Sequence, residues 1–450
     1  MYVQSLRLDT KHKKQKDMTK KIIIALIGIL SATGLKAQNV YVCDGFSYDA
    51  IPVSSVKDML FSTASGSSLK ITSTDGTTYA YDTDDIDSLT FEEPQFPAVS
   101  IVYNGTTASV TIASNVKGVT CSSGTSSHVV LTSTNTDTEY LYTVSGTSTN
   151  GSLTVNGDYK LSLQLAGVDL TSQKGAAIDI ECGKRIDLIL KNGTTNSLAD
   201  YASGDQKAAL YAKGHVEVKG AGTLNVKGNC KHAISAKEYF LVKASAGTIN
   251  ITGAVSDGIH CGKGEKGSDQ NYFQMNGGTI NISGCGSDGI DSDDYGCAKL
   301  KGGTLSLDVA ATGGNGLKCD SILTLSGTDV NINVSGNTAE GIRSVFLGNY
   351  NGGTVKGTVS GDGARGIRAK KSSDVITTGG GNAEFAGTDV TLTVTGTTYT
   401  IDGTKCMGIK VDATLHQTAG KLDITVNSTD SKTTALSAKT DNKEGGTRTF

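Results

Sequence analysis

Apolar and polar residues alternate along most of this chain. In residues 277–283 (GGTINIS), 302–308 (GGTLSLD) and 327–335 (GTDVNINVS), every second position is aliphatic and its neighbours are Asn, Ser, Thr or Asp. This period of two predicts β-strands with one buried face and one solvent face. We therefore expect an all-β protein.

The alternating segments recur at regular distances of 24 to 34 residues. Each begins at a glycine, which Thr follows in all but the last case: Gly222, Gly247, Gly278, Gly303, Gly327, Gly353, Gly387 and Gly420. A second block, Gly followed by Ile or Leu, recurs at Gly258, Gly289, Gly316, Gly341, Gly366 and Gly408. Repeats built from strands predict a single-stranded right-handed parallel β-helix, a solenoid of roughly ten coils of about 25 residues.

Alignment of the second block predicts which side chains face the core. Small residues stand two positions after its Ile or Leu: Ala212, Ala236, Cys261, Ser292, Cys319, Ser344 and Ala369. The residues between them and the aliphatic position point outward by alternation: Tyr211, Ser235, His260, Asp291, Lys318, Arg343, Arg368 and Lys410. We expect an outward row with a basic C-terminal half.

The chain divides into five segments by composition. Residues 1–37 form a leader with a signal peptide, whose start we place at Met18: lysines, an apolar run over 22–30, then small residues to Ala37. The run is too short to anchor the mature protein in a membrane, so we expect export to the periplasm, the cell surface or the medium. Then come a small β-rich domain (38–96), a β-rich cap with the first coils (98–165), the coils (166–438) and a polar tail (439–450).

Net charge limits the classes of binding partner, and the cysteine content limits the possible disulfides. The formal net charge is −3, and removal of the basic leader makes it −9, which disfavours nucleic acid as a partner. Nine cysteines leave at least one unpaired within a single chain. Cys261 and Cys319 lie two coils apart, beyond disulfide reach, and we expect both to be buried as small apolar residues. No feature of the sequence specifies an oligomeric state.

Acidic residues gather in the middle repeats. Stacked carboxylates repel one another unless a cation or a basic neighbour lies between them, and calcium takes six to eight oxygen ligands. The expected calcium ligands are Asp257, Asp288, Asp291, Asp293, Asp294 and Asp320. The alternative is that Asp precedes Gly in these blocks because both residues favour turns.

The basic part of the outward row suggests recognition of acidic sugars. Lys318, Arg343, Arg368 and Lys410 could bind uronate carboxylates, which Arg holds with two parallel hydrogen bonds. The alternative is that a solvent-facing strand position simply tolerates charge. Further expected ligand contacts, from the turns that lengthen around the acidic cluster, are His260, Tyr272, Phe273 and Tyr295. With no Trp and 6% aromatic residues, a flat stacking platform for sugars is weak.

Several longer motifs carry a family resemblance. YTVSGTSTNGSLTVNG, KHAISAKEYF, SDGIHCGKGEKG and GSDGIDSDDYG resemble the secreted bacterial carbohydrate-binding β-helix family of the Bacteroidetes type, which is similar in shape to pectate lyases. The resemblance covers residues from about 100 to 436. It implies a calcium-carrying, non-catalytic module that binds plant-type polysaccharides, including acidic ones.

Two other functions remain open. A polysaccharide lyase would need calcium on the uronate carboxylate and a Lys or Arg as base, and Asp291 with Lys318 is the candidate pair. A structural or adhesive surface rod would bind another protein through its turns. We expect calcium-assisted, non-catalytic polysaccharide binding ahead of both.

Overall fold

The computed structural model describes residues 6–7, 39–44, 46–62, 68–83, 86, 88–94, 96–262, 271–371 and 380–450. The predicted leader lies outside these residues except for Leu6–Arg7, and so do residues 263–270 and 372–379, which belong to two of the lengthened turns expected around the acidic cluster. Within the described part, the chain forms strands, one 3-10 turn at Val53–Ser55 and no α-helix. The all-β prediction is therefore confirmed. No helix in that part is long and apolar enough to cross a membrane.

The chain consists of two compact units, Met1–Pro97 and Ala98–Phe450. The first unit contains two small antiparallel sheets around a core that includes Ile51, Leu69 and Ile71. One sheet has the order β1-β7-β2-β3, with β1 (Leu6–Arg7), β7 (Ser88–Thr90), β2 (Asn39–Asp44) and β3 (Ser47–Pro52). The other has the order β4-β5-β6, with β4 (Val56–Ser62), β5 (Ser68–Ser73) and β6 (Thr78–Asp82).

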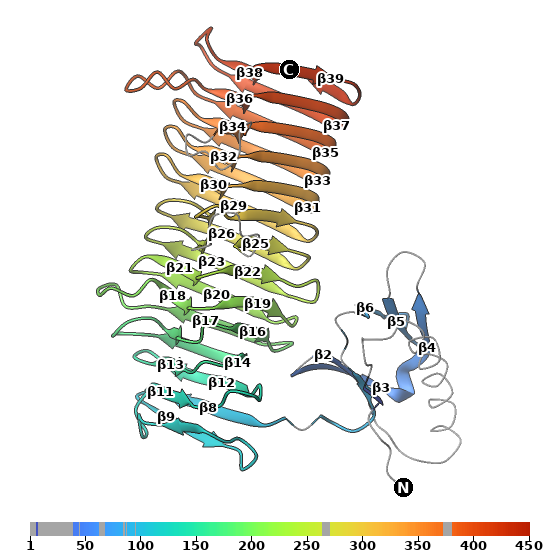
Figure 1. Ribbon diagram of the computed structural model, residues 1–450, viewed down its shortest axis with the longest axis vertical. Helices are drawn as coiled ribbons and strands as arrows, with labels where there is room; N and C mark the ends of the chain where they lie inside the picture. The colour runs from blue at the N-terminus through green and yellow to red at the C-terminus, as the bar shows by residue number, and fades with distance from the viewer. Residues whose placement is uncertain are drawn as a thin grey trace. The chain divides into compact units, whose positions relative to one another are not determined.

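The second unit is dominated by two long sheets whose strands stack in successive layers (Figure 1). One is a 13-stranded sheet of short strands, parallel from β11 onward. In spatial order it contains β10 (Val119–Cys121), β11 (His128–Ser133), β13 (Ser152–Asn156), β15 (Ile178–Ile180), β18 (Ala208–Ala212), β21 (His232–Ala236), β24 (Ile259–Cys261), β27 (Ile290–Ser292), β30 (Asn315–Cys319), β32 (Glu340–Ser344), β34 (Arg365–Ala369), β36 (Met407–Val411) and β38 (Thr434–Ser437).

The other is a 20-stranded sheet that begins with an antiparallel hairpin, β8 (Ala98–Asn104) and β9 (Thr107–Ile112). Its remaining strands pair in parallel, and from β31 to β37 one long strand replaces two short ones in each repeat. They are β12 (Leu141–Ser148), β14 (Leu161–Thr171), β16 (Arg185–Leu190), β17 (Thr195–Ala199), β19 (His215–Lys219), β20 (Thr223–Gly228), β22 (Tyr239–Val242), β23 (Thr248–Ala254), β25 (Tyr272–Met275), β26 (Thr279–Cys285), β28 (Cys297–Leu300), β29 (Thr304–Ala310), β31 (Ile322–Ser335), β33 (Leu347–Ser360), β35 (Asn382–Thr395), β37 (Thr414–Asn427), β39 (Thr440–Lys443) and β40 (Thr447–Thr449).

The last two strands lie in residues 439–450, the segment that the sequence analysis describes as a polar tail. Thr440 pairs with Thr414, and Thr447 pairs with Lys421, so β39 and β40 both extend the parallel sheet beside β37. Their side chains are largely exposed. Because the backbone of β37 offers a complete row of hydrogen-bonding groups, a polar segment can add to it without an apolar face.

The core lies between the two sheets and follows the predicted alternation. The seven small residues expected to face inward are all buried, including Cys261 and Cys319, which confirms that alignment. Aromatic residues stack inside the same core, with Phe240 and Phe273 at 6.4 Å between ring centroids and Tyr350 and Phe385 at 4.5 Å. Burial of each large aliphatic side chain contributes about 1.5–3 kcal/mol, repeated in every layer.

The glycine of the second block is required by packing between repeats. A Cβ on Gly289 would lie 2.5 Å from the carbonyl oxygen of Gly316, and one on Gly341 would lie 2.5 Å from that of Gly366. The same contact recurs at Gly258, Gly316 and Gly366. Since such distances leave no room for a side chain, this glycine is fixed by close strand approach and not by a turn.

Candidate functional site

One outward row of the 13-stranded sheet brings together most of the predicted site residues. Strand register places His260 beside Asp291, Asp291 beside Lys318, and so on through Arg343 and Arg368 to Lys410. We call these six residues the charged row. Adjacent members belong to neighbouring strands, which lie about 4.8 Å apart.

A second row stands next to it, at the position before each glycine block. It contains His232, Asp257, Asp288, Asn315, Glu340 and Arg365, and we call it the pre-glycine row. Its members are linked from repeat to repeat: the Asp288 backbone N–H donates to Asp257 Oδ1 at 3.1 Å, and Asn315 Nδ2 donates to Asp288 Oδ1 at 2.7 Å. Hydrogen bonding along the row offsets the cost of burying these groups.

Lys318 lies among three of the expected metal ligands. Its Nζ is 3.0 Å from Asp291 Oδ1, 3.6 Å from Asp293 Oδ1 and 3.8 Å from Asp320 Oδ1. Burial opposes a charge on Lys318, but these carboxylates hold its pKa well above the usual range. Burial raises the pKa of Asp320 to about 7, assisted by a hydrogen bond with Asp293. The protein itself therefore supplies the cation for this group of carboxylates.

Asp294 and Tyr295 form a left-handed turn between the middle strands. Their φ angles are 49° and 67°, Asp294 is exposed, and Tyr295 is half-buried. A non-glycine residue with positive φ is uncommon and is often found at functional or tightly constrained turns. In the ranges that the structure describes, neither residue belongs to a cluster of possible metal-ligating atoms.

The other expected metal ligands converge. Asp257, Asp288 and Asp291 are buried, and each places a carboxylate oxygen within 4.8 Å of the other two. Burial raises the pKa of Asp288 to about 6, and the charges of Asp291 and Asp257 add to this effect, against a hydrogen bond from Asn315. Three carboxylates from neighbouring repeats meet the oxygen preference of calcium.

Two stacked histidines border this carboxylate cluster. The rings of His232 and His260 are 4.4 Å apart between centroids at an angle of 13°. Burial lowers the pKa of His232. Burial alone would also lower the pKa of His260, but the close carboxylates of Asp257 and Asp291 raise it to about 9. His232 was missed in the sequence because Ala233 stands where the later repeats, from Gly258 onward, have a glycine.

The basic residues at the C-terminal end of the charged row differ in how closely each one pairs with a carboxylate. Arg368 is buried and holds Asp412 with two hydrogen bonds of 2.7 and 2.8 Å. Arg343 Nε is 3.8 Å from Glu340 Oε2, a contact too long for a hydrogen bond. Lys410 donates to Ser437 Oγ at 3.3 Å and has no carboxylate within ion-pair distance among the described residues. Arg343 and Lys410 are therefore the basic residues of the charged row whose charges pair least closely with a carboxylate.

Tyr272 and Phe273, which the sequence predicts as ligand contacts, lie on opposite faces of β25. Phe273 faces inward and is buried, so its prediction as a ligand contact is wrong: alternation in β25 sends Phe273 to the core and Tyr272 outward. Tyr272 stacks on Tyr239 at 4.6 Å between centroids, and Lys299 Nζ lies 4.2 Å from the ring centroid of Tyr272. These contacts leave its ring faces largely covered.

A shallow groove of about 200 Å³ crosses four strands of the 20-stranded sheet. Its outward-facing lining comes from β14, β17, β20 and β23 and includes Asp169, Ser197, Asn225, Lys227 and Thr252. Hydroxyl and amide groups of this kind can bond sugar hydroxyls. The sequence shows that these outward positions are polar in successive repeats. Strand alternation alone does not predict that the surface there forms a groove.

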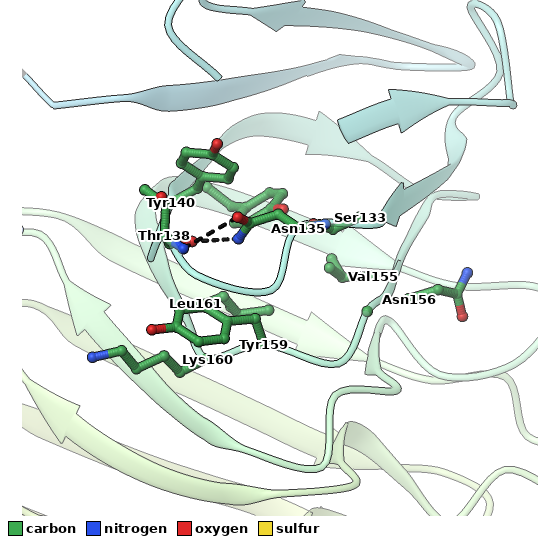
Figure 2. A pocket seen from close by; sticks show the side chains of 11 residues that line it. Ser133, Asn135, Thr138, Tyr140, Val155, Asn156, Tyr159, Lys160 and Leu161 are labelled. Atoms are coloured by element: carbon green, nitrogen blue, oxygen red, sulfur yellow. Dashed lines mark hydrogen bonds between the residues drawn. The ribbon is translucent and has the colours of Figure 1, made fainter. Parts of the chain in front are cut away.

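A second cavity, close to β11, β13 and β14, is too small for a sugar (Figure 2). Its volume is about 10 Å³, which corresponds to about one water molecule. Figure 2 shows Asn135 and Thr138 joined by hydrogen bonds at one side of it. We therefore exclude this cavity as a glycan site.

Comparison with known proteins adds to this description. A family model described as carbohydrate-binding domain-containing protein matches residues 125–389. A protein of that description from Acetivibrio thermocellus is 29% identical over 121 residues, which are 25% of this chain and 42% of the relative. The match thus spans less than half of the relative. A solved structure of a polysaccharide lyase-like protein from C. thermocellum, a gadolinium derivative, is 22% identical, covers 56% of this chain and 96% of its own, and has a TM-score of 0.45.

The family match covers more than half of the chain and includes His232, Asp257, His260, Asp291 and Lys318. This chain belongs to the family of carbohydrate-binding domain-containing proteins.

Proposed function

We propose that this chain is a non-catalytic polysaccharide-binding protein for plant-type or acidic, uronate-containing glycans. The observation that carries the proposal is the register of Lys318, Arg343, Arg368 and Lys410 in neighbouring strands. Their spacing of about 4.8 Å approximates the length of one monosaccharide in an extended chain. Membership of a carbohydrate-binding family supports the same class of ligand.

Within this row, Arg343 and Lys410 are the proposed direct contacts to uronate carboxylates. They stand two strands apart, about 10 Å, with Arg368 between them. Since Asp412 occupies both terminal nitrogens of Arg368, Arg368 is proposed to fix the geometry of the row. Guanidinium and ammonium groups bind carboxylates through charge-assisted hydrogen bonds.

The environment of Lys318 favours binding over lyase chemistry. A lyase base must accept the proton next to the uronate carboxylate, whereas the three carboxylates around Lys318 hold its pKa above the usual range and keep it protonated. His260, with a pKa raised to about 9, is protonated at neutral pH as well. Neither group is prepared to act as a base.

Calcium assistance is part of the proposal, and Asp257, Asp288 and Asp291 would hold the ion. They are the expected ligands whose oxygens converge. Calcium there would neutralise three buried carboxylates and fix the relative position of β24 and β27. Asp293 and Asp320 fit less well, since Lys318 already lies between them.

We also infer that residues 98–450 form a single-stranded right-handed parallel β-helix in an exported protein. In-register parallel pairing across consecutive repeats supports the solenoid, and parallel crossovers are right-handed in about 98% of cases. Export rests on the signal-peptide pattern of residues 18–37.

The groove at Asn225 and Lys227 favours a second candidate, a surface for neutral glycans. It carries hydroxyl and amide groups and lies outside the charged row. Binding of a neutral glucan that Asn225→Ala weakens and Arg343→Ala leaves unchanged would assign that ligand to the groove.

The test mixes the purified full chain with polygalacturonate and with neutral plant polysaccharides, each with calcium or with a chelator. Depletion of protein from solution and formation of unsaturated uronate are followed together. Depletion by polygalacturonate without product is the expected result. Unsaturated product would make the protein a lyase, and no depletion by any glycan would favour the adhesive rod.

A further inference from the structure

We propose that His232, Asp257 and His260 form a binding site for a zinc-class divalent ion such as Zn²⁺ or Co²⁺, with Asp291 as a neighbouring carboxylate. The four residues come from three consecutive repeats: His232 begins β21, Asp257 and His260 flank Ile259 at β24, and Asp291 lies in β27. The strand register that builds the charged row therefore also assembles these donors.

The donor atoms of His232, Asp257 and His260 all lie within 4.8 Å of one another, and Asp291 lies beside His260. Asp257 Oδ2 lies 3.1 Å from His232 Nδ1 and 3.4 Å from His260 Nδ1, and Asp291 Oδ2 lies 3.7 Å from His260 Nδ1. Two ligands that each stand 2.0–2.1 Å from a tetrahedral zinc ion are about 3.3 Å apart. Small side-chain movements would therefore close the site around the ion.

Hydrogen bonding within the cluster is incomplete without a cation. The backbone N–H of Asp257 donates to His232 Nδ1 at 3.4 Å, while Asp257 Oδ2 faces the same nitrogen at 3.1 Å. One ring nitrogen cannot accept the first contact and donate the second in the same state. His260 Nδ1 is buried and makes no well-aligned hydrogen bond in the described structure, although two carboxylates flank it. A metal ion that displaces the proton of His260 would bind both ring nitrogens and interact favourably with both carboxylates.

Burial fixes the donors and leaves one side accessible. The side chains of His232, Asp257 and Asp291 are 4%, 6% and 9% exposed. His260 is 22% exposed, so an ion can reach the site past its ring. Stacking of the two imidazoles holds them side by side before an ion arrives, which lowers the entropic cost of binding.

The mixture of ligands selects the class of ion. Imidazole nitrogen with carboxylate oxygen suits zinc, cobalt and nickel, whereas calcium favours oxygen alone. Asp291 can serve the site while it remains paired with Lys318, because Lys318 contacts Oδ1 and His260 faces Oδ2. This site shares Asp257 and Asp291 with the proposed calcium site, so the two ions would compete.

The test titrates Co²⁺ and Zn²⁺ alone into the full chain, stripped with a chelator and free of any histidine tag, by calorimetry and by visible absorption of bound Co²⁺. We expect one strong site per chain and an intense spectrum of four-coordinate cobalt. His232→Asn and His260→Asn should each weaken Co²⁺ binding at least about tenfold. His416→Asn, a histidine on β37 that pairs with Glu444, is the matched control and should leave binding unchanged.

Asp288→Asn separates this proposal from the calcium proposal. It removes a ligand of the calcium cluster alone, so Ca²⁺ binding should weaken while Co²⁺ binding persists, and His260→Asn should have the opposite effect. Retention of cobalt affinity in folded His232→Asn and His260→Asn, judged by circular dichroism, would overturn the zinc-class site. A weak six-coordinate cobalt spectrum of the unaltered protein would do the same without any variant.

Discussion

The guanidinium of Arg368 holds the carboxylate of Asp412 in a two-point contact between adjacent repeats, with Nη1–Oδ1 at 2.7 Å and Nη2–Oδ2 at 2.8 Å. Arg368 is buried, so this contact compensates for the loss of water around its charge. Asp412 stands in its repeat where Asp293 and Asp320 stand in theirs, directly after the small inward residue. The end of the charged row thus repeats the arrangement around Lys318.

Loss of this partner should destabilise the protein. Asp412→Ala leaves a buried guanidinium without its carboxylate, at a cost of about 2–4 kcal/mol, measured by urea denaturation. Asp423→Ala removes the partner of Lys421 in a more exposed pair and should cost about 0.5 kcal/mol. Equal losses in the two variants would show that the Arg368–Asp412 contact has no special weight.

In the later repeats, the glycine of the second block should not tolerate a side chain. Gly341→Ala places a Cβ 2.5 Å from the Gly366 carbonyl oxygen and 3.0 Å from Val359 Cγ2. The strands would have to separate, and we expect a loss of about 1–3 kcal/mol. Gly183→Ala is the control, since nothing lies within 4 Å of its added Cβ, and its effect should stay within about 1 kcal/mol. A neutral Gly341→Ala would contradict the packing account.

Asp179 should make stability depend on pH. Burial raises its pKa from 3.8 to about 6, and the charge of Glu181 adds to this. Between these pH values the folded state binds more protons than the unfolded state, so the free energy of unfolding falls as the pH rises from about 4 to 6. Asp179→Asn should remove that fall and make the protein more stable at neutral pH.

Asp362 provides a control, because its effect on the pH dependence of stability should be opposite to that of Asp179. Hydrogen bonds from the Thr397 hydroxyl and backbone N–H lower the pKa of Asp362. Its contribution to stability is present above the ordinary carboxyl pKa and is lost as the pH falls through the lowered value. Asp362→Asn should therefore reduce stability at neutral pH. Denaturation curves across pH 3–8 that shift in the same direction for both variants would refute the assignments.

The sequence predicted the repeats well, because alternation and glycine spacing report on one strand at a time. The inward positions of Cys261 and Cys319 and the outward positions of Lys318 and Arg343 follow from that local rule. Phe273 was misplaced because a turn of uncertain length precedes β25 and leaves its phase ambiguous.

The network within the site could not be predicted in the same way. Pairing of Arg368 with Asp412 joins residues 44 positions apart, and the convergence of His232 with Asp257 and His260 requires the register of three repeats. Carboxylates and basic groups can be read from the sequence, but their distances arise only when the strands stack. Those distances also decide which cations, such as Lys410, have no carboxylate within ion-pair distance in the part of the chain that the structure describes.

Binding of polygalacturonate to Arg343→Ala/Lys410→Ala tests the central claim most directly. The matched control is Lys356→Ala/Lys421→Ala, which removes two exposed positive charges from the 20-stranded sheet and changes net charge equally. We predict that the first variant loses at least about tenfold in affinity, equivalent to about 1.4 kcal/mol, while the control binds like the unaltered protein. Equal affinity of both variants for polygalacturonate would contradict recognition of acidic glycans by the charged row.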